Sequence, residues 1–125
     1  MTDEERRAVG MRVRREVLGD AHVDNAVTNT TEFTADFQDF ITSYAWGDLW
    51  ARPGLTRQQR SMVTLALLAG LGRHEEVAMH VRAALRNGLT PAEISEVLLH
   101  VAVYAGVPAA NRAFVIADNT IKESS

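Results

Sequence analysis

The sequence predicts an all-α fold, and three observations support this. Signals for helix starts and stops recur along the chain, apolar residues repeat every three or four positions, and no segment shows the alternation of a strand between hairpin turns. With 125 residues, the chain is long enough for one compact domain and too short for two. Residues 1–125 are therefore expected to form a single multi-helix domain.

The first half of the chain is expected to contain three helices. Thr2 and Glu5 have the spacing of a capping box, so the first helix should begin there and end near Gly19. A short second helix is expected over residues 20–29. "NTTEF" supplies cap candidates for a third, and "ARPGL" then marks a turn. The apolar residues that repeat at helical spacing in this third segment are Phe33, Phe37, Phe40 and Ile41.

The second half is expected to contain four more helices. "TRQQ" has capping-box spacing before a helix that runs to Leu71, and "RNG" ends the next helix, within residues 72–88. In "TPAE", Thr90 is an N-cap and proline occupies the first helical position. Pro108 is well placed to open the last helix. The tail "KESS" is expected to fray.

The segment from Met62 to Leu71 is apolar on nearly every side of its helix. Such a helix must be covered all round. A small domain has little interior, so coverage by neighbouring subunits in a homo-oligomer is favoured over complete burial within a monomer.

Composition excludes several classes of function. The formal net charge of −3 argues against broad, charge-driven binding to nucleic acid. With no cysteine there can be no disulfide, thiolate nucleophile or cysteine-ligated zinc. The N-terminus is charged where a signal peptide is apolar, and the run "MVTLALLAGLG" is too short to span a bilayer. A soluble cytoplasmic protein is expected, without nucleic-acid or membrane partners.

Glu76 and His80 form the first candidate site. They lie four residues apart in a predicted helix, so the carboxylate can reach the imidazole and favour its protonated form. His80 would then serve as a proton donor near neutral pH. The alternative is an ordinary salt-linked helix surface, and two ligands are too few for a catalytic zinc. Both residues are expected at the edge of the apolar stripe formed by Val77, Val81, Ala84 and Leu85.

His100 interrupts the apolar run "EVLLHVAVYAG", with Tyr104 one turn later on the same side. A histidine there costs free energy unless it has a partner or lines a cavity. Two interpretations stay open, a hydrogen-bonded core histidine and a residue of a ligand site.

Aromatic and basic residues gather before the second half. "YAWGDLWARPGL" brings Trp46 and Trp50 close to Arg52, a combination that can wall a pocket for a flat anion or anchor a helix connection. Arg57 and Arg60 stand at a helix start, where cations are unfavourable, which indicates a bound anion or an acidic partner residue.

These stretches together resemble the carboxymuconolactone decarboxylase family. The matching pieces run in order and cover nearly the whole chain: "VRREVLGDAHVDNA", "EFTADFQDFITSYAWGDLWARPGLTRQQRSMVTLALLAGLGRHEE" and "HVRAALRNGLTPAEISEVLLHVAVYAGVPAANRAF". The resemblance implies a fold like that of alkylhydroperoxidase-D-like proteins, assembled into trimers or hexamers. Peroxidases of that group carry Cys-x-x-Cys ahead of a helical histidine. His80 matches this histidine, whereas Arg73 and Glu76 stand at the cysteine positions, so no thiol chemistry is implied.

The reaction implied by the resemblance is the cofactor-free decarboxylation of a dianionic lactone, 4-carboxymuconolactone, to 3-oxoadipate enol-lactone in protocatechuate breakdown, the β-ketoadipate pathway. His80 would donate the proton and Glu76 would hold its charge. No metal is implied. Two alternatives stay open, a decarboxylase of a related lactone and a non-enzymatic helical module that binds partners. The expected substrate contacts are Arg60, Arg52, Trp46, His100 and Tyr104.

Overall fold

The computed structural model describes residues 1–125 and contains seven α-helices, one π-helix and no strand, which confirms the all-α prediction. The chain divides into two compact units, Met1–Thr56 (unit 1) and Arg57–Ser125 (unit 2). Each unit is described by itself. The expectation of one domain over the whole chain stays a prediction.

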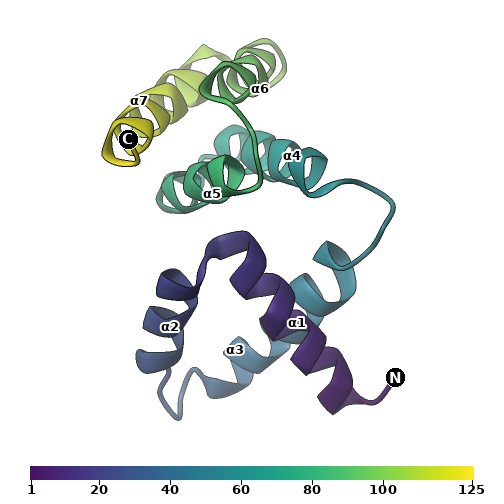
Figure 1. Ribbon diagram of the computed structural model, residues 1–125. Coiled ribbons are helices and arrows are strands. Elements are labelled where there is room, and N and C mark those ends of the chain that lie inside the picture. The colour runs from purple at the N-terminus through teal and green to yellow at the C-terminus, as the bar shows by residue number, and fades with distance from the viewer. The chain divides into compact units, whose positions relative to one another are not determined.

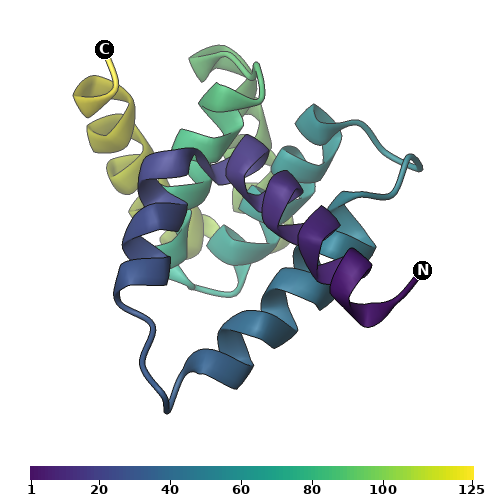
Figure 2. The ribbon, with the colours of Figure 1, turned by 60° about the horizontal axis from the view of Figure 1, so that its bottom comes forward.

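Unit 1 is built around α1, which packs along η1. Figure 2 shows α1 crossing the rod that α3 and η1 form end to end, while α2 returns beside α1. The elements are α1 (Asp3–Leu18), α2 (Asp20–Thr28), α3 (Ala35–Ile41) and the π-helix η1 (Thr42–Trp50).

Local signals fix both ends of α1 as the sequence predicted. The Thr2 hydroxyl accepts a hydrogen bond from the Glu5 amide at 3.0 Å, and the Glu5 carboxylate accepts one from the Thr2 amide at 3.1 Å. At the other end Gly19 has φ 92°, a backbone conformation that glycine adopts without strain.

Two glycines allow α1 and η1 to approach closely. A Cβ added to Gly10 would meet the Thr42 carbonyl oxygen at 2.0 Å, and one added to Gly47 would meet the Arg6 carbonyl oxygen at 2.7 Å. Both contacts are with backbone, which cannot rotate away. The crossing therefore depends on the absence of a side chain at both positions.

The third predicted helix begins later than its aromatic repeat suggests. α3 starts at Ala35, so Phe33 lies in the preceding turn and is 95% exposed. Phe37 and Phe40 are also exposed, and the buried aromatics of unit 1 are Trp46 and Trp50 of η1. The i→i+5 hydrogen bonds of a π-helix widen the turn. Residues four apart on one face of η1 are buried, namely Thr42, Trp46 and Trp50.

Unit 2 consists of four helices in two layers, α4 with α5 and α6 with α7, as Figure 1 shows. The elements are α4 (Arg57–Gly70), α5 (His74–Arg86), α6 (Pro91–Tyr104) and α7 (Val107–Glu123). All four contribute to one apolar core. Its most deeply buried members include Leu65, Val77, Val81, Ile94, Leu98 and Ala113.

The joint between α5 and α6 is fixed by local contacts. Asn87 follows α5 and donates a hydrogen bond to the hydroxyl of buried Ser61 on α4 at 2.9 Å. Gly88 has φ 98° and turns the chain. Thr90 then forms the predicted capping box with Glu93, which starts α6 at Pro91.

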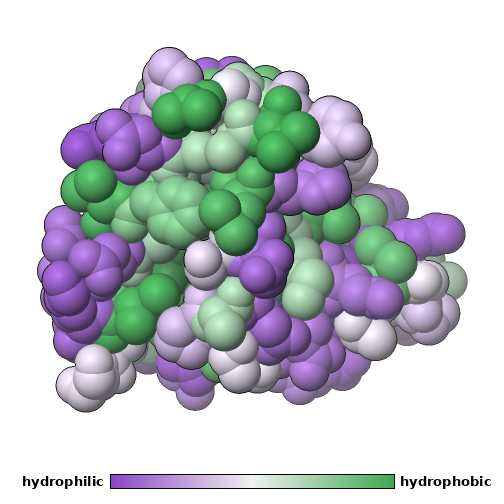
Figure 3. Space-filling model, turned by 90° about the horizontal axis from the view of Figure 1, so that it is seen from above, coloured by the Kyte–Doolittle hydropathy of each residue, from purple (hydrophilic) through white to green (hydrophobic).

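One surface of unit 2 is apolar and uncovered within the unit. We call it the α4–α6 face, and its exposed residues are Val63, Leu67, Leu71, Leu99, Val103 and Tyr104. Figure 3, viewed from the side of α6 and α7, shows hydrophobic side chains gathered on this end of the unit. The alternative that α4 is buried on all sides within one chain is therefore wrong. No helix of the chain has the length and hydropathy needed to cross a membrane.

Candidate active site

His80 lies on α5, in a row with core residues. Val77 and Val81 on the same helix are fully buried, and His80 is 8% exposed. The sequence predicted an edge position, but the imidazole lies deeper than that. A titratable ring kept from bulk water at this depth interacts strongly with any charged group beside it. His80 is therefore the candidate acid of unit 2.

Glu76, one turn before His80, is exposed. Together with Glu75 it lies in the first turn of α5, where carboxylates are favoured by the helix dipole. The four-residue spacing permits contact between the two side chains, so pairing of Glu76 with His80 stays a prediction.

Arg60 is a buried arginine in the first turn of α4, 9% exposed. Arg57 shares this turn, which contains no acidic residue. Guanidinium groups at the positive end of a helix are stabilised by a bound anion or by an acidic partner residue. The role of Arg60 in binding a carboxylate stays a prediction.

Trp46 and Arg52 belong to unit 1. Trp46 is 6% exposed and its ring centre lies 5.2 Å from that of Trp50, with an angle of 31° between the planes. Arg52 lies in the turn after η1 and is exposed. Trp50 is buried, as expected of a packing anchor.

His100 and Tyr104 lie on the α4–α6 face. Both are exposed, and their rings stack with centres 4.9 Å apart. The interpretation of His100 as a core histidine is therefore wrong, because this side of α6 faces outward. His100 lines two shallow hollows of about 450 and 330 Å³ between α4 and α6, and His80 lines neither. The predicted residues of unit 2 thus fall into two groups, one on α4 and α5 and one on α6.

Arg14 on α1 carries a buried charge that was not predicted from the sequence. The side chain is 6% exposed and lines a hollow of unit 1 of about 640 Å³. Its position directly after Val13, in the buried stripe Val13–Val17, was the signal available. The structure contains no group of three or more histidine or acidic side chains able to hold a metal ion.

The protein is all-helical, since neither unit contains a strand. Its buried histidine on α5 is a candidate acid–base site. Residues 35–119, more than half of the chain, match the carboxymuconolactone decarboxylase family. This chain belongs to that family, as the resemblance of its sequence indicated.

Curated relatives extend the match to nearly the whole chain. The 4-carboxymuconolactone decarboxylase of Acinetobacter baylyi is 48% identical over 123 residues, covering 98% of this chain and 92% of the relative. The nitrosuccinic acid decarboxylase of Metarhizium robertsii is 46% identical over 114 residues, covering 91% and 80%. A 4-carboxymuconolactone decarboxylase sequence from Pseudomonas putida is 48% identical over 48 residues, which is 38% of this chain and all of that sequence.

Proposed function

We propose that this chain is a carboxy-lyase that converts 4-carboxymuconolactone to 3-oxoadipate enol-lactone in protocatechuate breakdown, without a cofactor. The observation that carries the proposal is the 48% identity over 98% of the chain to the Acinetobacter baylyi decarboxylase. A buried histidine on the helix that carries the predicted proton donor supports it.

The chemistry needs no electron sink outside the substrate. When the carbon–carboxylate bond breaks, its electron pair moves through the ring alkene to the lactone carbonyl oxygen, and CO2 departs. The resulting dienolate is stabilised by conjugation. Protonation at a ring carbon then gives the enol-lactone, and the donor regains its proton from solvent.

His80 is the proton donor in this proposal, and Glu76 orients it and holds its charge. Positioned proton transfer is worth about 10²–10⁴-fold in rate. The burial of His80 supports the assignment, because a donor and a carbanion kept from bulk water interact more strongly than solvated groups would.

Arginine side chains are proposed to bind the carboxylates of the substrate. Arg60 is the first candidate because it is buried beside the N-terminus of α4, and Arg52 is the second. Trp46 is proposed to form an aromatic wall of the substrate pocket. His100 and Tyr104 are proposed as donors to the developing oxygen charge in the assembled protein, where the α4–α6 face is covered.

We propose that the chain forms a homo-oligomer, a trimer or hexamer, in the cytoplasm, and that residues 1–125 act as one domain. The exposed leucines and valines of the α4–α6 face support assembly, because contiguous apolar surface of this kind commonly marks a protein interface. A second copy is the occupant expected there.

The test is an ultraviolet assay of the purified full chain with 4-carboxymuconolactone, in buffer treated with chelator and free of thiols. We expect release of CO2 together with formation of the enol-lactone. Absence of turnover by the folded oligomer would favour the alternative of a non-enzymatic partner-binding module.

A second substrate has a specific observation in its favour, the 46% identity to the nitrosuccinic acid decarboxylase. The nitro group of nitrosuccinic acid can take up the electron pair left by CO2, as the lactone carbonyl does in the first proposal. Parallel assays of both acids decide between them through the ratio of the two kcat/KM values. We expect the lactone to be preferred.

A further inference from the structure

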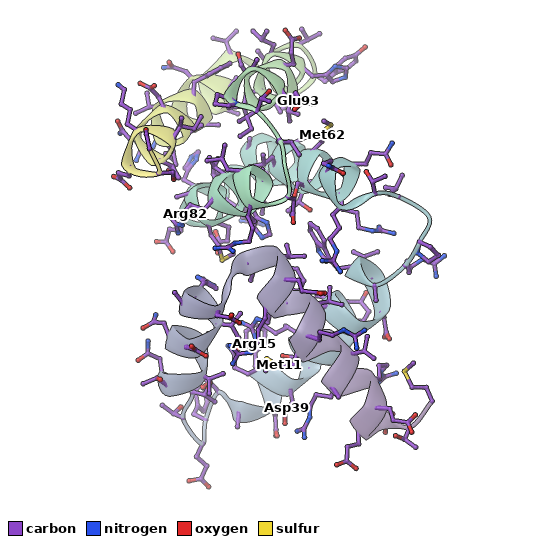
Figure 4. The ribbon with its side chains drawn as sticks, in the orientation of Figure 1. Met11, Arg15, Asp39, Met62, Arg82 and Glu93 are labelled. Carbon is purple, nitrogen blue, oxygen red and sulfur yellow. The ribbon has the colours of Figure 1, made fainter.

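Unit 1 contains a hollow of about 640 Å³ that belongs to it alone. Residues of α1, α2, α3 and the start of η1 line it. Figure 4 labels Met11 on α1 and Asp39 on α3, which mark two of its walls. Pockets that bind small molecules commonly occupy roughly 300–1,000 Å³. None of the residues proposed for decarboxylation lines this hollow.

The guanidinium of Arg14 is the buried charge of this hollow. Its Nη1 donates to the side-chain oxygen of Gln38 at 3.1 Å and to the hydroxyl of Thr42 at 3.3 Å. Both partners are neutral, and no carboxylate lies within ion-pair distance. Nε is buried and makes no hydrogen bond. Burial lowers the pKa of Arg14, which is the expected response of a cation that lacks a compensating anion.

The carboxylates around the hollow do not supply that anion. Asp39 pairs with Arg7, with 3.5 Å between the nitrogen and the oxygen. Glu4 lies on an exposed part of α1. A buried guanidinium that makes no ion pair costs free energy, and an incoming anion would remove that cost.

The other side chains that line the hollow indicate the chemistry of the part of the ligand that does not contact Arg14. Apolar atoms, from four apolar side chains and from the carbon atoms of the polar ones, supply more of the surface of the hollow than polar atoms do. Because Arg14 carries one uncompensated positive charge, a ligand with one negative charge is favoured. A second negative charge on the ligand would meet the carboxylates of Glu4 and Asp39. The apolar walls are formed by Ala8, Met11, Val27 and Ala35.

We propose that unit 1 binds the single carboxylate of a small organic acid with an apolar body, and that Arg14 holds this carboxylate in a charge-assisted hydrogen bond. This ligand differs in charge from the dianionic substrate proposed for the decarboxylase. The site is therefore an additional one, for a monoanion.

Benzoate is a suitable probe, since it combines one carboxylate with an apolar ring. Titration calorimetry of the full chain measures its affinity, and amide chemical shifts locate it. We expect benzoate to bind and to shift amides of α1 and α3. Benzyl alcohol, which lacks the charge, and phthalate, which has two carboxylates, are expected to bind at least about tenfold more weakly.

Two variants test the site independently. Arg14→Met removes the charge and is expected to weaken benzoate binding at least about tenfold. Ala8→Leu keeps Arg14 and fills the hollow from an exposed helical position, so it should block binding without loss of fold. Arg12→Gln, an exposed arginine on the same helix, is the matched control and should bind as wild type does.

Affinity that survives Ala8→Leu in a folded protein would overturn the proposal, even if Arg14→Met failed to fold. Tighter binding of phthalate than of benzoate would also overturn it, as would benzoate shifts confined to α4 and α5. Loss of binding in both variants, with Arg12→Gln unchanged, would support it.

Discussion

His80 places a titratable ring among core residues, at 8% exposure. Histidine is the residue type whose unperturbed charge change falls near neutral pH. A protein that needed only packing at this position could use an aliphatic residue at lower cost, because a buried polar group must be compensated. A chemical role of His80 stays a prediction.

Replacement of His80 by alanine should lower kcat by at least about 10²-fold, because the proposed proton donor is lost. The measurement is steady-state turnover of the lactone, with circular dichroism to verify the fold. His74→Ala is the matched control, at the start of the same helix and outside the proposed machinery. Turnover within a few-fold of wild type in His80→Ala would remove His80 from the mechanism.

Glu76→Gln distinguishes a carboxylate that takes part in the reaction from one that only lies on the helix surface. A surface pair at this spacing contributes about 0.2–0.5 kcal/mol, which would change the rate less than about threefold. If Glu76 orients the imidazole during the reaction, kcat should fall by about tenfold or more. Its neighbour Glu75→Gln is the control and should retain activity, since it is also exposed in the first turn of α5.

Single residues were predicted well where their neighbours in the sequence determine the environment. The spacing of Val77 and Val81 placed His80 beside the core, although not at its actual depth. Arg14 was overlooked because a long basic side chain next to an apolar stripe usually extends its charge to solvent. The neutral partners that hold its charge inside come from residues 24 and 28 positions later.

At the scale of elements, the helix ends follow from short local signals. Capping boxes at Thr2 and Thr90 were visible because all their parts lie within four residues. The π-helix η1 was not visible, since the same residues can form i→i+4 or i→i+5 hydrogen bonds and packing decides between them. The repeat of phenylalanines suggested a helix but did not show which side would be covered.

Gly10→Ala should destabilise the protein, although alanine normally favours a helix by about 0.5–1 kcal/mol over glycine. The added Cβ would meet the Thr42 carbonyl oxygen at 2.0 Å, so α1 and η1 must separate. Overpacking of this kind costs about 1–3 kcal/mol. Urea denaturation followed by circular dichroism measures the free energy of unfolding.

Gly54→Ala is the control for this prediction, because a Cβ there would meet nothing within 4 Å. It should leave the free energy of unfolding nearly unchanged. Equal stability of Gly10→Ala and wild type would mean that the α1–η1 crossing is looser than described.

At the scale of the whole molecule, the exposed apolar surface of unit 2 is expected to influence the association of copies more than the modest net charge of −3 does. Leu67 on α4 is 58% exposed and Val103 on α6 is 76% exposed. The sequence indicated that α4 required cover beyond its own chain, but the size of an assembly depends on the geometry of the contact, which no local pattern encodes.

Leu67→Glu should shift the proposed oligomer to monomer, because a carboxylate buried in an apolar contact would lack a partner. Light scattering at micromolar concentration measures the mass. Lys122→Glu, a charge change at an exposed position on α7, is the control and should remain assembled. A wild-type chain of monomer mass would contradict the assembly itself.

Both tryptophans of the chain lie in η1, with ring centres 5.2 Å apart, and unit 2 contains none. Tryptophan fluorescence, excited at a wavelength that tyrosine does not absorb, therefore originates in unit 1 alone, whereas far-ultraviolet ellipticity reports on the helices of both units. Melting curves from the two signals that superimpose would show units 1 and 2 unfolding together. Curves with separate midpoints would show that each holds its structure independently.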